Sequence, residues 1–264
     1  MTSIFMVIGI VGWIALLTSI YVYKKAKDER LKSITIDDKE STDPNVVVIG
    51  GGTGQSVFLR GLNKRTRNIT AIVTVADDGG GSGVLREDLG MLPPGDIRNC
   101  LLALANIEPT MKEVMQYRFT EGALKGQSFG NLFLAAMNGL YGNFEVALYK
   151  MSQIFAITGK VLPVTLNDIN LIAKLKNGKI VKGESRIPKE VKDDKTYIER
   201  VYLDEQDAVP LDEVINSIEN ADIIIMGPGS LYTSIIPNLL VNGVVDAIEK
   251  SKAPKVYICN IMTQ

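Results

Sequence analysis

The sequence contains no histidine, only two cysteines and one tryptophan among its 264 residues. The absence of histidine excludes Ser-His-Asp and Cys-His catalysis, histidine general bases and every histidine-ligated metal site. Cys100 and Cys259 are too few for a four-thiolate zinc site or a disulfide framework. An excess of basic residues is also missing, since 29 Lys and Arg stand against 30 Asp and Glu, which argues against nucleic-acid binding. Any chemistry must therefore use carboxylates, hydroxyls, Lys, Arg, backbone amides or a bound Mg²⁺.

The first long feature is an uncharged apolar run from Ile4 to Tyr23. As a helix, a run of this length spans roughly the 30 Å of a bilayer's hydrocarbon core. A basic flank, KKAKDERLK, follows it, and no Lys or Arg precedes it. This asymmetry predicts a single-pass anchor in the cell membrane with the main domain in the cytoplasm. A cleaved signal peptide would have a basic start and a small-residue cleavage site, and a buried core helix is the other alternative.

Residues 24–44 are rich in charges of both signs and end at Pro44, as expected of a polar linker. Residues 45–264 then have the length of one α/β domain. The chain as a whole is 46% apolar and 22% charged, a composition typical of a globular protein. We therefore expect an anchor, a linker and one folded domain.

The folded part begins with a strand, a glycine-rich turn and a helix. Val46–Ile49 is a continuous β-branched run, typical of a strand buried on both faces. A helical apolar face follows the turn, and Ile69–Asp77 predicts a second strand. Strand, helix and strand in about 30 residues form a βαβ unit.

Further strands are expected at Ala221–Gly227 and Lys255–Asn260, with an amphipathic helix between them. Residues 97–157 favour helices, and residues 160–203 favour strands with a hairpin turn at Asn177-Gly178. The pattern predicts a Rossmann-like doubly wound parallel sheet with inserted helical and β-rich segments.

The first glycine-rich turn, Gly51-Gly52-Thr53-Gly54, is a candidate phosphate site. The amides and the partial positive charge of the following helix can hold a phosphate. The strict G-x-G-x-x-G pattern fails, because Gln55 stands where the third glycine would be. The alternative is that these glycines serve only a tight turn.

An acidic pair, Asp77 and Asp78, follows the second predicted strand. In dinucleotide-binding folds an acidic residue about twenty positions beyond the first turn bonds a ribose hydroxyl, and a pair of carboxylates could instead bind Mg²⁺. Gly79–Gly83 would let the backbone approach a ligand. A flexible loop with solvated carboxylates is the alternative.

Two further segments offer polar residues at helix starts. In PPGDIRN, Asp96 is placed to cap a helix or to present its carboxylate to a substrate or metal, and Asn99 falls in the first turn. In GQSFGNL, Asn131 lies at another helix start, where an ordinary cap is the alternative.

The second glycine-rich turn, in GPGSLYTS, follows the strand that ends at Gly227. Gly227 and Gly229 would free the backbone, while Ser230 and Thr233, with the neighbouring Ser234, supply hydroxyls. Ligands of doubly wound sheets bind outside the carboxyl ends of the strands. Two such turns at one edge would suit a diphosphate better than a monophosphate, unless the second is a plain turn with a serine cap.

These segments together resemble the gluconeogenesis factor family (YvcK, also called GlmR), which belongs with the CofD-like proteins. The resemblance covers nearly all of residues 45–264 and not the apolar run. It is carried by VVVIGGGTG, TVADDGGGSGVLREDLGMLPPGDIRNCLLALA, SFGNLFLAAM, VLPVT, ADIIIMGPGSLYTSIIPNLL and KVYICNIMTQ. Chains of this family usually continue past the last motif, so the sequence is expected to be truncated at Gln264.

The resemblance implies a fold that binds UDP-N-acetylglucosamine and regulates carbon flow to cell-wall precursors and cell shape, with glucosamine-6-phosphate synthase as the implied partner. In the related 2-phospho-L-lactate transferases, the same fold holds GDP and a deazaflavin with Mg²⁺, and their substrate-contacting Asp matches Asp96. We therefore expect a UDP-sugar-binding regulator without turnover, with catalytic residues absent and Mg²⁺ optional. A CofD-type phosphotransferase is the alternative, and an NAD-dependent oxidoreductase is the weakest hypothesis. A homo-oligomer is compatible with each, and nucleic acid is not an expected partner.

Overall fold

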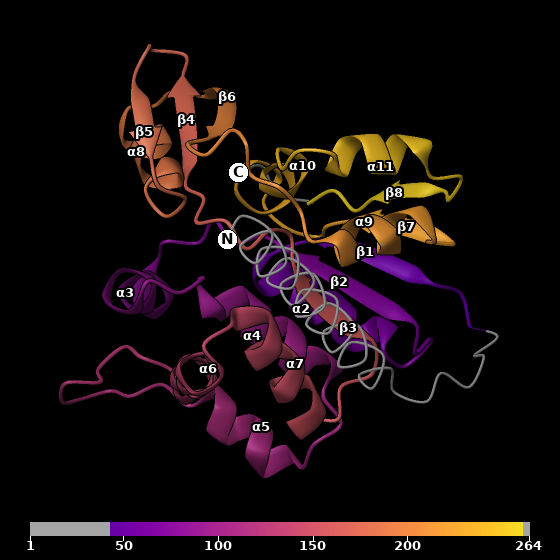
Figure 1. The fold of residues 1–264 in the computed structure, drawn as a ribbon. Helices are drawn as coiled ribbons and strands as arrows, with labels where there is room; N and C mark the ends of the chain where they lie inside the picture. The colour runs from indigo at the N-terminus through magenta and orange to yellow at the C-terminus, as the bar shows by residue number, and fades with distance from the viewer. Residues whose placement is uncertain (1–42, 261–264) are drawn as a thin grey trace, which may run out of the picture. The chain divides into compact units, whose positions relative to one another are not determined.

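Five parallel strands form the main sheet, in the order β3-β2-β1-β7-β8 (Figure 1). A computed structural model describes residues 43–260 of the chain. The strands of this sheet are β1 (Val46–Gly50), β2 (Ile69–Val73), β3 (Lys160–Pro163), β7 (Ile223–Met226) and β8 (Lys255–Tyr257). Strand β1 is central and buried along its whole length, as its β-branched sequence predicts.

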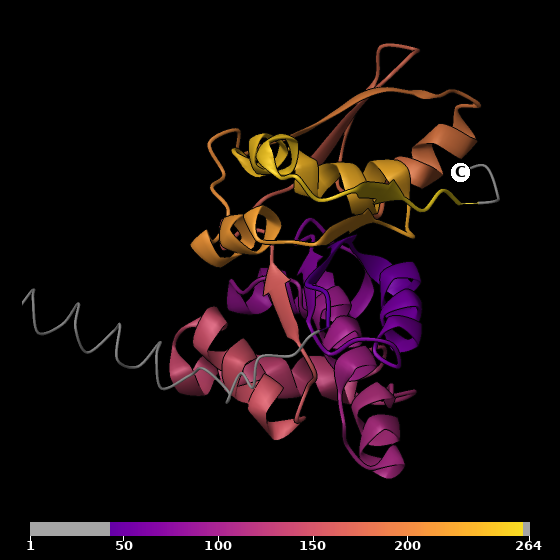
Figure 2. The same cartoon turned by 90° about the vertical axis from the view of Figure 1, so that its right-hand side faces the viewer.

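Helices connect these strands and cover the sheet (Figures 1 and 2). They are α2 (Gly52–Leu62), α3 (Gly80–Leu89), α4 (Pro94–Leu104), α5 (Pro109–Gln116), α6 (Phe129–Tyr141), α7 (Phe144–Ile154), α9 (Asp212–Glu219), the π-helix η1 (Leu231–Ile235), α10 (Ile236–Leu239) and α11 (Val244–Lys250). Helix α2 packs against α4, α6 against α7, and α9 against α11. Apolar side chains such as Leu59, Leu101 and Val244 are fully buried in the core. Helix α4 is buried along almost its whole length and on nearly every side.

The strand order reverses at β1, and this reversal sets the place of the site. The chain moves from β1 to β2 and β3 on one side, and then crosses to β7 and β8 on the other. Val48 lies opposite Ala71 of β2 and Ile225 of β7. A doubly wound sheet leaves a crevice at such a reversal, outside the carboxyl ends of the strands. Here the crevice lies beyond Gly50 and Met226.

A smaller unit is inserted between β3 and α9 and contains a separate antiparallel sheet (Figure 1). It consists of β4 (Leu171–Leu175), β5 (Ile180–Lys182), α8 (Ile187–Asp193) and β6 (Ile198–Leu203), with the strand order β5-β4-β6. The hairpin expected at Asn177-Gly178 joins β4 to β5, and Gly178 has φ +88°. Below, this unit is called the insert.

Three sequence expectations are wrong in detail. Lys160–Pro163 belongs to the main sheet and not to the insert, because it pairs in parallel with β2. The second strand ends at Val73 and not at Asp77, since its ladder partners end at Gly50 and Pro163. The alternative of a flexible loop at Gly79–Gly83 is also wrong, because α3 begins at Gly80. Gly90 ends that helix in a left-handed conformation.

The predicted anchor at residues 4–23 and the linker up to residue 42 lie outside the described residues, and both remain predictions. Between residues 43 and 260, no single helix is long and apolar enough to span a membrane, although Leu231–Leu239 with Val244–Lys250 meets the length and composition criteria as a pair bent by 79°.

Candidate functional site

The two glycine-rich turns meet at the carboxyl edge of the main sheet. The first follows β1 and leads into α2, and the second follows β7 and leads into η1. A Cβ atom added to Gly54 would lie 2.7 Å from the carbonyl oxygen of Pro228. A Cβ atom added to Gly229 would lie 3.3 Å from the carbonyl oxygen of Gly51. Only glycine allows two backbones to approach so closely. The sequence prediction that the two turns form one edge is therefore correct.

The backbone of each turn adopts conformations that favour glycine. Gly52 has φ +71° and Gly227 has φ +90°, in the left-handed region that other residues rarely occupy. The bond between Gly227 and Pro228 is a cis peptide. Ser230 caps η1, because its hydroxyl oxygen accepts a hydrogen bond of 3.3 Å from the Thr233 amide.

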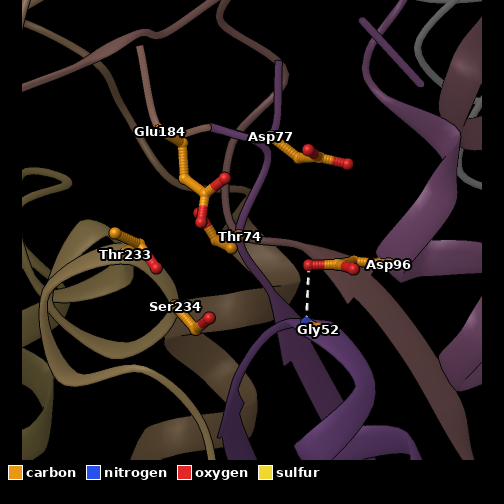
Figure 3. Close-up of a pocket in the computed structure, with 7 residues that line it drawn as sticks. All are labelled: Gly52, Thr74, Asp77, Asp96, Glu184, Thr233 and Ser234. Carbon is orange, nitrogen blue, oxygen red and sulfur yellow. Dashed lines mark hydrogen bonds between the residues drawn. The ribbon is translucent and has the colours of Figure 1, made fainter. Parts of the chain in front are cut away.

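A cavity of about 130 Å³ opens between the two turns (Figure 3). Its lining combines backbone, hydroxyl groups and carboxylates. The lining residues are Gly52, Thr74, Asp77, Asp96, Glu184, Thr233 and Ser234. Four of them, Gly52, Asp77, Asp96 and Thr233, are among the sequence candidates, and Ser234 was noted as their neighbour. Thr74 and Glu184 were not foreseen.

Asp96 joins helix α4 to the first glycine-rich turn. Its Oδ2 atom accepts a hydrogen bond of 2.5 Å from the Gly52 amide, at the start of α2. The expectation that Asp96 caps its own helix is wrong, since Pro93 is the N-cap and α4 starts at Pro94. Proline fixes φ near the helical value, so the helix begins three residues earlier than expected. Asp96 thus lies in the first turn, and its carboxylate takes the position of an anion at the start of α2.

The acidic pair after β2 is divided between two roles. Asp77 faces the cavity, and its Oδ1 atom accepts a hydrogen bond of 2.9 Å from the Gly79 amide. Asp78 contacts the insert, since its Oδ1 atom accepts a hydrogen bond of 2.8 Å from the Ser185 amide. Only Asp77 of the pair lines the cavity.

Glu184 reaches the cavity from the insert, more than one hundred residues away from Asp77 in sequence. It lies in the turn between β5 and α8, and its carboxylate is hydrogen-bonded to the Thr233 side chain. No sequence pattern marks this residue, because its position depends on how the insert folds back onto the main sheet. Among the carboxylates of the cavity, it is the one that the sequence does not reveal.

The three carboxylates that face the cavity all have raised pKa values. Burial raises the pKa of Asp96 to about 7, with the negative charge of Asp77 as the next cause, although the Gly52 amide opposes this shift. Burial also raises the pKa of Asp77 and of Glu184, and neighbouring carboxylates add to both shifts. No Lys or Arg lines the cavity within residues 43–260. The site is therefore acidic and poorly neutralised.

Two buried amides hold the strand ends in place beneath the cavity. Nε2 of Gln55 donates hydrogen bonds to the carbonyl oxygens of Val48 and Ile72, at 3.0 and 3.1 Å. Nδ2 of Asn238 donates to Gly50 at 2.9 Å and to Ser234 at 2.8 Å. These bonds tie α2 and α10 to β1 and fix the relative position of the two turns.

The remaining sequence candidates lie outside the cavity lining. Thr53 is exposed, and Gly51, Gly54, Gly227, Gly229 and Ser230 shape the two turns behind the lining. Asn99 accepts a hydrogen bond of 2.7 Å from Arg98. Asn131 is buried in the first turn of α6, which Ser128 caps. Asn99 thus contacts Arg98 directly, and the backbone amide of Asn131 donates to the Ser128 hydroxyl, which also accepts from Arg98.

Comparison with known proteins places this architecture in a family. The family model of 2-phospho-L-lactate transferase CofD matches residues 46–264. A protein of Thermoanaerobacterium thermosulfurigenes is 70% identical over 84% of this chain and 68% of its own length. The gluconeogenesis factor of Bacillus subtilis is 50% identical over 84% of this chain and 69% of its own length. The chain belongs to the gluconeogenesis factor family, which is CofD-like.

A solved structure agrees with this assignment. A Bacillus halodurans protein of known crystal structure is 51% identical, with a TM-score of 0.81 over 84% of this chain and 71% of that one. The relative from Clostridium acetobutylicum is longer, and this chain spans 49% of its length. Because this chain spans only part of that relative, we treat the activity of a whole gluconeogenesis factor as a proposal.

The described part of this gluconeogenesis-factor chain offers few groups for covalent or metal chemistry. Between residues 43 and 260, no group of three or more His, Cys, Asp or Glu side chains lies close enough together to hold a metal ion. The carboxylates of the cavity have the oxygen atoms that Mg²⁺ prefers. Cys100 is buried, and burial raises the pKa of its thiol well above the usual value, so it is an inert core residue.

Proposed function

We propose that this chain binds a nucleotide sugar, UDP-N-acetylglucosamine, and acts as a regulator without turnover. The observation that carries this proposal is the contact between Gly54 and Pro228, which brings two glycine-rich turns together at the carboxyl ends of β1 and β7. Helix starts and the backbone amides of glycine-rich turns favour phosphate groups. The Gly52 amide already donates to Asp96, so a bound phosphate would use the other amides of the turns or replace this carboxylate. A diphosphate would lie across both turns, where one turn alone offers too few contacts.

The chemistry of the cavity supports a sugar next to the diphosphate. Carboxylates and hydroxyls line it, and these groups accept hydrogen bonds from sugar hydroxyls and amides. Its volume of about 130 Å³ is below the roughly 300–1,000 Å³ of whole ligand pockets. We infer that the cavity holds the part of the ligand next to the diphosphate, while the nucleoside lies outside it.

Turnover is not part of the proposal, because a nucleophile with a matching base is missing from the described part of the site. The chain has no histidine, and Cys100 is fully buried. The serine and threonine hydroxyls share the cavity with carboxylates whose pKa values are raised, that of Asp96 to about 7. A binding role requires none of these groups to react.

Ligand-induced stabilisation tests the proposal. We expect UDP-N-acetylglucosamine at 100 times its dissociation constant to stabilise the full chain by about 2.7 kcal/mol. This corresponds to a rise in melting temperature of roughly 5–10 °C, measured with and without Mg²⁺. UDP should give a smaller rise, and GDP and NAD none. A chain that melts at the same temperature with and without the nucleotide sugar, although it is folded, would contradict the proposal.

A CofD-type phosphotransferase is the second candidate, favoured by Asp96. A carboxyl group with a pKa of about 7 beside a phosphate-binding turn suits a general base that accepts a proton from an attacking hydroxyl. The same melting experiment separates the two candidates, since stabilisation by GDP and not by the UDP-sugar would favour the transferase.

We propose glucosamine-6-phosphate synthase as the regulated enzyme, by which the chain would adjust carbon flow to cell-wall precursors and cell shape. The name of the Bacillus subtilis relative, gluconeogenesis factor, is consistent with a role in carbon routing. We expect the chain to change the activity of the purified synthase and the nucleotide sugar to reduce that change. An activity that stays constant at saturating chain, with and without the sugar, would contradict this role.

A further inference from the structure

The insert contributes one side chain to the cavity. Arg86 is buried and donates a hydrogen bond of 2.8 Å from Nε to Asp168 and one of 2.7 Å from its guanidinium to the carbonyl oxygen of Ile169. This bond pair fixes the base of the insert to α3. At the other end, Asp78 accepts the hydrogen bond from the Ser185 amide. The turn that carries Glu184 is therefore held to the main domain from both sides.

The backbone before Glu184 is built around Asp78. Gly183 has φ +108°, and a Cβ atom there would lie 2.4 Å from Oδ2 of Asp78. Only glycine combines this conformation with so close an approach. Consequently the next residue, Glu184, points into the cavity, where Figure 3 shows its carboxylate between Thr233 and Asp77.

Among residues 43–260, the Thr233 side chain is the hydrogen-bond partner recorded for the Glu184 carboxylate, and no Lys or Arg shares the lining of the cavity. The negative charges of Asp77 and Asp78 both act on this carboxylate and add to the rise of its pKa. A carboxyl group can accept more than one hydrogen bond, and this one lines the cavity, so it can accept a further bond from a ligand there. Such a group attracts hydroxyl and amide donors and repels phosphate.

From this geometry we propose that Glu184 is a specificity-determining residue that accepts a hydrogen bond from a hydroxyl or amide of the sugar. The assignment rests on the proposed nucleotide-sugar function. It divides the site by charge: the glycine-rich turns bind the diphosphate, and the insert recognises the sugar. The insert thus makes the site selective for a glycosylated nucleotide over the free nucleotide.

Titration calorimetry with UDP-N-acetylglucosamine and with UDP tests the assignment. We expect Glu184→Ala to weaken binding of the nucleotide sugar by about 10- to 100-fold, the effect of losing one hydrogen bond to a charged group. Binding of UDP should change less than about threefold, because UDP lacks the sugar. Glu184→Gln keeps a hydrogen-bond acceptor and should lie between the wild type and Glu184→Ala.

Glu199→Gln is the matched control. Glu199 lies on β6 of the same insert, but pairs with Lys174 at 3.1 Å and is 47% exposed. The Glu199→Gln variant should bind both ligands as the wild type does. The assignment is wrong, and the proposed function stands, if the wild type and Glu184→Ala bind the nucleotide sugar equally well. The same conclusion follows if Glu184→Ala weakens the binding of UDP by the same factor as that of the nucleotide sugar. If the folded wild type binds neither ligand, the proposed function fails and the assignment fails with it.

Discussion

Replacement of Gly54 by alanine is expected to abolish ligand binding, with a loss of affinity of about 100-fold or more. The added Cβ would lie 2.7 Å from the carbonyl oxygen of Pro228, and a backbone oxygen cannot move away as a flexible side chain could. The two glycine-rich turns would separate, and the diphosphate could no longer contact both. Crowding of this kind should also reduce the free energy of unfolding by about 1–3 kcal/mol. Calorimetry and thermal melting measure the two effects.

Gly61→Ala provides the control within the same helix. Gly61 also lies in α2, but a Cβ atom there would have no neighbour within 4 Å. Alanine favours a helix over glycine by up to about 1 kcal/mol, so this variant should be slightly more stable and bind normally. If a folded Gly54→Ala chain binds the ligand with wild-type affinity, the ligand does not bind where the two turns meet.

Asp96→Asn is expected to stabilise the protein at neutral and alkaline pH. The pKa of Asp96 is about 7 in the folded chain, against an ordinary value of 3.8. The folded state therefore binds more protons than the unfolded state between about pH 4 and pH 7, and the stability of the wild type falls as the pH rises through this range. Asparagine carries no charge and retains an oxygen for the Gly52 amide, so the variant avoids this loss.

The difference between Asp96→Asn and the wild type should be small below pH 4 and reach about 2–4 kcal/mol above pH 8. Thermal melting from pH 4 to pH 9 measures it. Asp204→Asn supplies a contrast of opposite sign: burial raises the pKa of Asp204, but hydrogen bonds from Asn170 and the Lys182 ammonium outweigh this effect and lower it to about 2. That variant should lose stability relative to the wild type at neutral pH and recover as the pH approaches 2. A pH-independent difference for Asp96→Asn would contradict a buried, protonated Asp96.

The sequence by itself determined the class of the fold and its binding edge. The β-branched run at Val46–Ile49 and the glycines after it are local signals, because strand burial and turn conformation depend on neighbouring residues in the chain. The same holds for the strand and turn around Gly227. Rules for parallel sheets then place both turns at one edge, so Gly52 and Thr233 could be assigned to the same site without coordinates.

Tertiary structure alone decided which carboxylates face the cavity. Asp77 and Asp78 are adjacent in sequence, yet only Asp77 lines the cavity, while Asp78 holds the insert. Asp96 was identified as a candidate, but its bond to Gly52 spans 44 residues and follows from the packing of α4 against α2. Glu184 has no local signal at all. Its place depends on the docking of the insert through Arg86 and Asp78, a long-range contact that neither periodicity nor turn chemistry encodes.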